Sequence, residues 1–274
     1  MSNSSPNEGG SAAARRKVVA DWRCNAGISM LTMLTLLAVW QAVTYTGLIQ
    51  PLYLPGPRAV AHKLWEAATT GYLDATLWQH LGASFSRIGL AFLAAVICAA
   101  PLGLAIGLNR VARAILDPLI EFYRPIPPLA YLPLIVIWFG IGEFSKILLI
   151  FLAIFAPIVV ACAAGVRKVD PVRIRVSQSL GASRWQVIRH VIIPSTLPDI
   201  LTGIRIGLGA GWSTLVAAEL IAATKGMGFM IQTASQFLNT DMVIAGILVI
   251  AVVAYMLEIG LRYLQHRLTP WQGH

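Results

Sequence analysis

The chain has 274 residues, of which 57% are hydrophobic and 12% are charged, and its mean hydropathy is +0.71. Because a soluble domain carries charge on roughly a quarter of its residues, this composition excludes an ordinary soluble enzyme and indicates an integral membrane protein. The net charge of +9 does not indicate nucleic-acid binding, because the basic residues collect beside apolar stretches.

Several apolar stretches are long enough to cross a hydrocarbon core about 30 Å thick, which takes about 20 helical residues. They predict an all-α membrane protein with about six transmembrane helices, at Gly27–Ile49, Ile88–Leu108, Leu119–Phe139, Ile147–Val166, Leu201–Ala223 and Met242–Leu264. The predicted organisation is a disordered, cytoplasmic N-terminal segment (1–26), a first transmembrane helix (27–49), a periplasmic amphipathic segment (50–80), a membrane domain (81–265) and a cytoplasmic tail (266–274).

Residues 1–14 are rich in Ser, Asn, Gly and Ala with almost no bulky apolar residue, which predicts disorder. No cleavable signal peptide is evident, because Arg15, Arg16 and Lys17 lie well before an apolar run that is long enough to span.

The distribution of basic residues predicts the orientation, since they collect on the cytoplasmic side. With the N-terminus inside, the cytoplasmic segments hold Arg15, Arg16, Lys17, Arg23, Arg110, Arg113, Arg167, Lys168, Arg173, Arg175, Arg184, Arg189, Arg262 and Arg267. The opposite side holds only Arg58, Lys63, Lys146 and Lys225. Both termini are therefore expected in the cytoplasm.

After the first span, Pro51, Pro55 and Pro57 interrupt any helix, and Arg58–His80 then has the apolar spacing of one or two amphipathic helices on the outer surface. They are expected to cover the bundle, and docking of a partner is the alternative.

The third span, Leu119–Phe139, contains Arg124 and the prolines Pro125, Pro127, Pro128 and Pro133. Such a break is tolerated in lipid only where protein or water satisfies the freed carbonyls, so this stretch is expected to face the bundle interior or a pathway. Arg124 could attract an anion there, or it could pair with Glu121 three residues earlier.

The segment 167–199 predicts a helical hairpin between two spans. Asp170 and Pro171 are typical of a helix start, and Gly181 of a helix end. Ser183 and Gln186 have the spacing of a capping box, and Pro194 and Pro198 are expected to end the second helix.

The second helix repeats Trp185, Ile188 and Ile192 on one face. A DNA-reading helix-turn-helix has a similar shape, but both ends of this hairpin are attached to membrane spans, so no nucleic-acid partner is expected. An exposed Trp185 fits a protein partner better.

Motifs of common enzymes are absent from the sequence. No lysine precedes Ser or Thr, so there is no phosphate loop, and no G-x-S-x-G, H-E-x-x-H or C-x-x-C occurs. Cys24, Cys98 and Cys162 are interpreted as structural, and no catalytic or metal site is predicted. Uphill transport would then use either an ion gradient, through Glu121, Glu219 or Glu258, or a separate cytoplasmic ATPase.

At the hairpin, Gln178–Ser183 followed by Val191–Pro194 resembles the EAA loop of binding-protein-dependent ABC importer permeases. Further blocks, at Tyr123–Pro128, Trp138–Gly142, Gly211–Glu219 and Thr269–Trp271, are similar to the nitrate, sulfonate and taurine branch of this family, and most of all to its taurine permeases. One departure is that Arg175-Val176-Ser177 stands where the family has Glu-Ala-Ala. The usual role of that glutamate is therefore not assigned to Arg175.

The resemblance implies a type I ABC importer (ABC transmembrane type-1) fold in a bacterial inner membrane, with no catalytic role. The implied substrate is a small organosulfonate, most of all taurine. The alternatives are another sulfonate, nitrate, or ion-coupled transport of a small anion. The implied partners are cytoplasmic ABC ATPase subunits, which use ATP and Mg²⁺, a periplasmic binding protein and a second copy of the chain. This chain itself is expected to bind no cofactor. ATPase coupling is assigned by the resemblance to Leu180, Gly181, Ala182, Ser183, Trp185, Ile188 and Pro194.

Two further groups are predicted from residue type and spacing. Small residues repeat every four positions at Gly203, Gly207 and Gly211, which favours close helix packing, within the chain or across the subunit interface, over a substrate role. The pathway candidates are Arg124, Pro127, Pro128, Trp212, Ser213, Thr214 and Glu219. Among these, Glu219 and Arg124 could complement the ammonium and the sulfonate of taurine.

Overall fold

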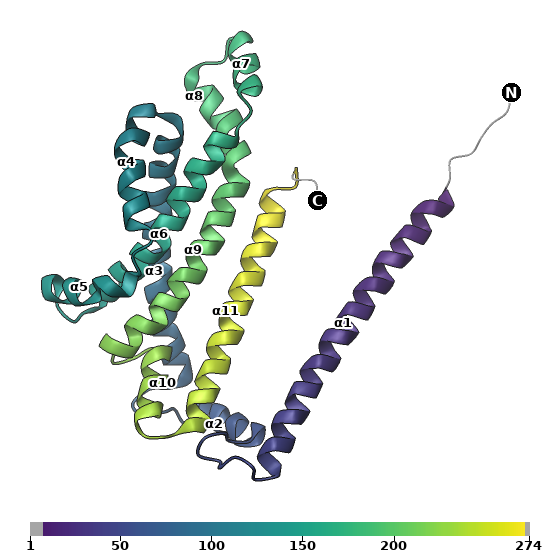
Figure 1. Cartoon of the computed structure of the whole chain (residues 1–274), viewed down its shortest axis with the longest axis vertical. Coiled ribbons are helices and arrows are strands. Elements are labelled where there is room, and N and C mark those ends of the chain that lie inside the picture. Colours follow the sequence, from purple (N-terminus) through teal and green to yellow (C-terminus); the bar gives the residue numbers. More distant parts are fainter. Residues whose placement is uncertain (1–7, 272–274) are drawn as a thin grey trace. The chain divides into compact units, whose positions relative to one another are not determined.

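The computed structural model describes residues 8–271, and it describes side chains from residue 27 onward except that of residue 222. Within this range the chain forms helices and no strand (Figure 1). It contains five helices long and apolar enough to cross a membrane, or six if one bent helix pair is a single span. The prediction of an all-α membrane protein with about six spans is therefore confirmed. Residues 1–63 and 64–274 form two compact units, which are described separately.

The first unit contains α1 (Glu8–Tyr45), whose apolar part is Gly27–Tyr45. The expected disorder of residues 1–26 is wrong from Glu8 onward, while residues 1–7 lie outside the described range. Alanine is the best helix former, and extending an existing helix costs less than starting one, so the span continues towards the N-terminus. At its other end, α1 is tied to the proline-rich loop because Trp40 Nε1 donates to the Pro55 carbonyl at 3.1 Å.

The helix α2 (Pro57–Thr69) begins, as predicted, beside the prolines that end the first span. In the second unit, its residues Leu64, Ala67 and Ala68 pack with Met227 and Met230, so this part covers the bundle as expected. The amphipathic segment ends earlier than the predicted residue 80. Thr76 and Gln79 form a capping box there, and α3 (Leu77–Leu108) begins directly after Thr76.

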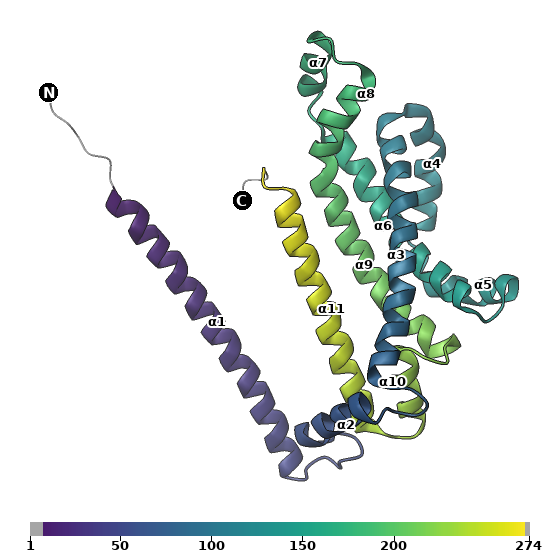
Figure 2. The same cartoon turned by 180° about the vertical axis from the view of Figure 1, so that it is seen from behind.

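Three long helices form the centre of the second unit: α3, α6 (Glu143–Lys168) and α9 (Ile193–Ala222) (Figures 1 and 2). They approach closely because small residues lie where they meet. A Cβ added to Gly103 of α3 would lie 2.6 Å from Cys162 Cβ of α6. Cys162 is fully buried in this contact, and its Sγ lies 3.4 Å from the Ala100 carbonyl. This is the structural role predicted for that cysteine.

The predicted third span is not one straight helix. It consists of α4 (Arg110–Tyr123), a 3-10 turn η1 (Pro128–Tyr131) and α5 (Leu132–Phe139), with a 90° bend between α4 and the following part. Pro125, Pro127 and Pro128 have no amide to donate, and each disfavours a helical residue before it, so the helix stops at Tyr123. No residue of α4 is buried in this chain, and Pro125 and Pro127 are exposed. Leu132 and Ile135 of α5, in contrast, are buried against Leu149 and Ala218, so this part of the stretch faces the bundle as expected. That the exposed prolines face a pathway stays a prediction.

The last elements are α10 (Met227–Gln236) and α11 (Thr240–Leu268), the final predicted span. In Figures 1 and 2, α10 lies at one end of the second unit, whereas the C-terminal end of α11 points towards the end that carries α7 and α8.

Candidate functional site

The hairpin between α6 and α9 is capped as the sequence predicts. It begins with α7 (Pro171–Ser179), where the Asp170 side chain accepts a hydrogen bond from Val172 N at 2.8 Å. Gly181 has φ +86°, which a residue with a side chain rarely adopts. Ser183 and Gln186 then form the capping box of α8 (Arg184–Val187), with Ser183 N donating to Gln186 Oε1 at 2.8 Å.

The second helix of the hairpin does not end at Pro194 or Pro198, which corrects the prediction. The chain stays helical from Arg184 to Ile221, through a π-helical turn η2 (Ile188–Ile192) and into α9. Pro194 removes an amide donor and its ring requires space, and the wide π turn directly before it provides that space. The hairpin is thus continuous with a membrane helix.

The inner face of the hairpin packs on the end of α6. Val187 and Ile192 are buried there together with Val166 and Val169. Burying a side chain of this size contributes about 1.5–3 kcal/mol. An ion pair between Lys168 Nζ and Asp199 Oδ1, at 2.5 Å, joins the start of the hairpin to α9. The hairpin is therefore packed against α6 and joined to α9, so it is held by two core helices.

The outer face of the hairpin carries apolar side chains that nothing in the described chain covers. Val172, Val176, Leu180 and Trp185 form this surface, called the hairpin tip below, and Leu180 is 84% and Trp185 67% exposed. The arginines Arg173, Arg175, Arg184 and Arg189 are exposed around it.

Of the residues assigned to ATPase coupling, Leu180, Gly181, Ser183 and Trp185 are exposed, whereas Ala182, Ile188 and Pro194 are only partly exposed. Ala182 and Ile188 pack inward against the buried cluster on α6. The apolar face predicted for the second helix of the hairpin is thus divided into two parts. Its inner part packs on α6, and its outer part, at the hairpin tip, is exposed and can bind a partner.

At the opposite end of the bundle lies a group of charges, called the Arg87 cluster below, in which Arg87, Lys146 and Glu219 are buried and Glu143 is 57% exposed. Arg87 Nε and Nη2 donate to both carboxylate oxygens of Glu143, at 2.6 and 2.9 Å, and Arg87 Nη1 donates to Glu219 Oε1 at 2.7 Å. Lys146 Nζ lies 2.8 Å from Glu143 Oε1. The Ser84 hydroxyl donates to Glu219 at 2.8 Å. These charges are paired and hydrogen-bonded, which is what burial requires.

The Arg87 cluster also holds the loop before α10. The Lys225 carbonyl accepts from Arg87 Nη1 at 2.6 Å, and Gly228 N donates to Glu219 Oε2 at 2.9 Å. Gly226 N donates to His80 Nδ1 at 3.1 Å. The cluster therefore connects α3, α6, α9 and the start of α10, and its geometry is that of a structural joint.

Glu219 does not face open space in this structure, and a pathway role for it stays a prediction. It is 0% exposed, and its oxygens accept from Arg87, Ser84 and Gly228. Reasoning from the sequence missed the Arg87–Glu143 pair. The available signal was the presence of charged residues in long apolar stretches, each of which needs a partner.

Arg124 is exposed on the turn between α4 and η1, and it forms no ion pair with Glu121 within the described residues. Pro127 is exposed beside it, and Pro128 is partly exposed. Arg124 therefore does not combine with the buried Glu219 to form a site in this chain.

The other pathway candidates come from α9. Trp212 and Ser213 line a pocket of about 230 Å³ between α9 and α11, together with Arg205 and Glu258. Thr214 is buried, and its hydroxyl donates to the Ala210 carbonyl at 2.9 Å, so it has an internal partner.

The glycines of α9 lie against α6. A Cβ added to Gly207 would lie 3.0 Å from the Ile154 carbonyl, and one added to Gly211 would lie 2.5 Å from Ile154 Cγ1. Gly203 faces Ala161 and Pro157 in the same way. The contact is within one chain, not between subunits, and the four-residue spacing aligns the glycines on one face.

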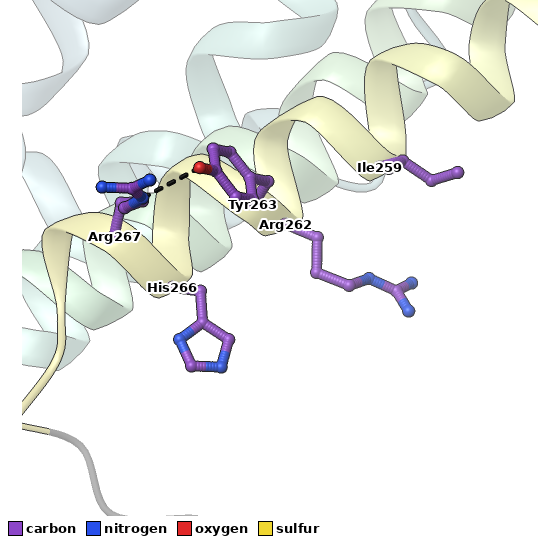
Figure 3. A pocket seen from close by; sticks show the side chains of 5 residues that line it. All are labelled: Ile259, Arg262, Tyr263, His266 and Arg267. Carbon is purple, nitrogen blue, oxygen red and sulfur yellow. Dashed lines mark hydrogen bonds between the residues drawn. The ribbon is translucent and has the colours of Figure 1, made fainter. Parts of the chain in front are cut away.

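A basic pocket of about 390 Å³ lies at the C-terminal end of α11, lined by Ile259, Arg262, Tyr263, His266 and Arg267 (Figure 3). Within it, Arg267 Nε donates to Tyr263 Oη at 2.9 Å. Because all lining residues come from one helix, this hollow has no opposing wall in the described chain.

Comparison with known proteins gives concordant results. The family described as "binding-protein-dependent transport system inner membrane component" matches residues 91–270. The taurine transport system permease protein TauC of Escherichia coli K12 is 63% identical over 247 residues, which cover 90% of this chain and 90% of that protein. The putative aliphatic sulfonates transport permease protein SsuC of the same organism is 34% identical and is covered to 92%.

Among solved structures, the inward-facing MetNI methionine ABC transporter is similar with a TM-score of 0.61. The match covers 70% of this chain and 96% of that one, at 16% identity, so it concerns the fold.

Proposed function

We propose the function of this chain from its family. The chain belongs to the family of binding-protein-dependent transport system inner membrane components. It is the membrane component of an ABC importer and not an enzyme. We infer that it is the permease subunit of an ATP-driven importer for a small organosulfonate, most of all taurine.

The main support for taurine as the substrate is the 63% identity to a taurine permease over 90% of both chains. The more distant similarity to a putative aliphatic sulfonate permease favours other sulfonates as the second candidate. An ion-coupled carrier is not supported, because Glu219, the most buried of the carboxylates considered for it, already accepts from three partners.

Membership of this family implies a partner ATPase and a substrate-binding partner. The hairpin tip is the proposed contact for the cytoplasmic ATPase, which would bind the ATP and Mg²⁺ while this chain binds no cofactor. Apolar anchors such as Trp185, surrounded by polar residues, are typical of the centre of protein interfaces. A second copy of the chain would complete the pathway. The binding protein would dock at the end that carries α10.

The physical mechanism follows from how the hairpin is attached. Because its inner face is packed on α6 and its second helix continues into α9, a displacement of the tip is transmitted to two core helices. Closure of two ATPases would then move these helices and change the side of the membrane to which the pathway opens.

The proposed location is the inner membrane of a bacterium, with both termini in the cytoplasm. The distribution of basic residues supports this orientation. The C-terminal end of α11 points towards the end of the second unit that carries the hairpin (Figure 2). This supports a cytoplasmic C-terminus, because the hairpin is proposed to be cytoplasmic.

The test is uptake of radiolabelled taurine by cells of the source organism from which this chain alone has been deleted. Uptake is expected to fall to background and to return when the chain is supplied from a plasmid. Unchanged uptake, in cells without a second taurine importer, would exclude the proposed substrate. Uptake of sulfate in the same cells is the control.

A further inference from the structure

A second group of charges lies within the predicted spans, apart from the Arg87 cluster. Arg205 comes from α9, and Glu258 and Arg262 come from α11. Glu258 Oε1 lies 3.5 Å from Arg205 Nε and 3.2 Å from Arg262 Nη2.

This group differs from the Arg87–Glu219 pair in burial and in hydrogen bonding. The side chains of Arg205 and Glu258 are 35% and 36% exposed, whereas Arg87 is 5% and Glu219 0% exposed. The contact of Arg205 with Glu258 is too long for a good hydrogen bond, and Arg205 makes no hydrogen bond to any described residue. The N–H donors on its two Nη atoms therefore remain available to a ligand.

Arg205 lies four residues inside the predicted span that begins at Leu201, which corresponds to about 6 Å at the helical rise. A charge inside a span is costly against lipid, and such residues generally face a protein interior or a water-filled path. The side of α9 and α11 that carries these charges is therefore expected to face the pathway or a neighbouring subunit.

The same charges line the pocket of about 230 Å³ between α9 and α11, with Trp212 and Ser213 as further lining residues. Trp212 is buried, and its Nε1 has no hydrogen-bond partner among the described residues. A buried indole N–H without a partner is unusual, and it points to a polar group that is absent from the isolated chain.

We propose that this pocket is a binding site on the translocation pathway for a zwitterionic aminoalkanesulfonate, with the sulfonate on Arg205 and the ammonium on Glu258. This inference rests on the proposed function and identifies the residues that would distinguish substrates. A guanidinium can donate two parallel hydrogen bonds to an oxyanion, and a carboxylate pairs with an ammonium. In taurine the two charges are separated by two carbons, so they suit a cation and an anion that lie on facing helices a few ångströms apart.

Arg262 sets the charge of the site. With Arg205 and Arg262 positive and Glu258 negative, the group has one net positive charge, which favours entry of the anionic end of the ligand. A sulfonate that lacks the ammonium would still bind Arg205 but would leave Glu258 without a partner from the ligand.

The experiment measures equilibrium binding to the purified complex of this chain and its ATPase in lipid nanodiscs, without binding protein. The probes are radiolabelled taurine and 2-hydroxyethanesulfonate, which keeps the sulfonate and replaces the ammonium by a hydroxyl. Glu258→Gln is expected to weaken taurine binding about tenfold and to leave 2-hydroxyethanesulfonate within about threefold, whereas Arg205→Gln weakens both about tenfold or more.

The matched control is Glu121→Gln, which removes an exposed carboxylate from α4 and is expected to change neither affinity. If Arg205→Gln does not assemble, Arg205→Lys keeps the charge but loses the two-point contact, and it is expected to weaken both ligands to a smaller degree.

Equal effects of Glu258→Gln on both ligands, or no effect on either, would overturn the proposed site. So would a wild-type complex that binds neither probe although wild-type cells import taurine, and this result would leave the proposed function intact. Absence of taurine uptake in wild-type cells would instead reject the proposed function itself.

Discussion

Arg87 of α3 donates to Glu219 of α9 at 2.7 Å although 132 positions separate them in the chain. The pair is buried, and Glu143 of α6 holds the other side of the same guanidinium. It therefore joins the three central helices of the second unit at the end opposite to the hairpin.

Removing Arg87 tests this joint. Arg87→Ala would leave the buried carboxylate of Glu219 without its counter-charge, and loss of one partner of a buried ion pair typically costs about 3–5 kcal/mol. We expect a large fall in the thermal unfolding temperature of the purified chain. Arg173→Ala, on the exposed face of α7, is the control and should leave the unfolding temperature nearly unchanged. Equal stability of the two variants would contradict the structural role of the cluster.

The loop before α10 gives a second test of the same region. A Cβ added to Gly228 would lie 2.5 Å from the Val216 carbonyl and 2.8 Å from Glu219 Cβ. Gly228→Ala should destabilise the protein by about 1–3 kcal/mol, because a packed site must shift to accept the methyl group. Gly260→Ala in α11 meets nothing within 4 Å and should be neutral or slightly stabilising. Comparison of the two unfolding curves measures the difference, and a tolerated Gly228→Ala would show that α10 does not sit tightly on α9.

The hairpin tip and the inner face of the hairpin should respond differently to truncation. Leu180→Ala combined with Trp185→Ala removes exposed apolar surface, so it should abolish co-purification of the ATPase while leaving the unfolding temperature of the chain almost unchanged. Val187→Ala removes a buried side chain and should lower that temperature. Should the tip variant retain the ATPase at wild-type level, the proposed contact would be misplaced.

Gly181 tests the turn of the hairpin by itself. Its φ of +86° is strained for any residue with a Cβ, although a Cβ there would meet nothing within 4 Å. Gly181→Ala should therefore cost about 1 kcal/mol through backbone strain, and Gly181→Asn should cost less, because asparagine tolerates the left-handed region better. The transport rate in the presence of the ATPase and the unfolding temperature of both variants measure the cost of each substitution. If Gly181→Ala were as stable as wild type, the turn would have another backbone conformation.

The features that could be predicted from the sequence are those with local causes. Apolar length identified the spans, and the caps at Asp170 and Ser183 involve residues two or three positions apart. The 90° bend after Tyr123 was missed because prolines mark a break but do not specify its direction. The continuation of the helix through Pro194 was missed because a π turn compensates for the proline.

The partners of buried charges could not be predicted for a different reason. Arg87, Glu143 and Glu219 are far apart in the chain, and only the packing of three helices brings them together. The same packing separates Glu219 from the surface and leaves Trp212 and Ser213 beside Arg205. Residue type alone indicated that these residues needed partners, and the fold determined which partners they have.

An ATP-driven importer is tested by taurine uptake into liposomes that contain the purified chain and its ATPase, with ATP inside and the binding protein and labelled taurine added outside. We expect accumulation against a gradient that requires the ATPase, the binding protein and ATP, and none when any one of them is omitted. Accumulation by the chain alone, driven by an ion gradient, would contradict an ATP-driven importer.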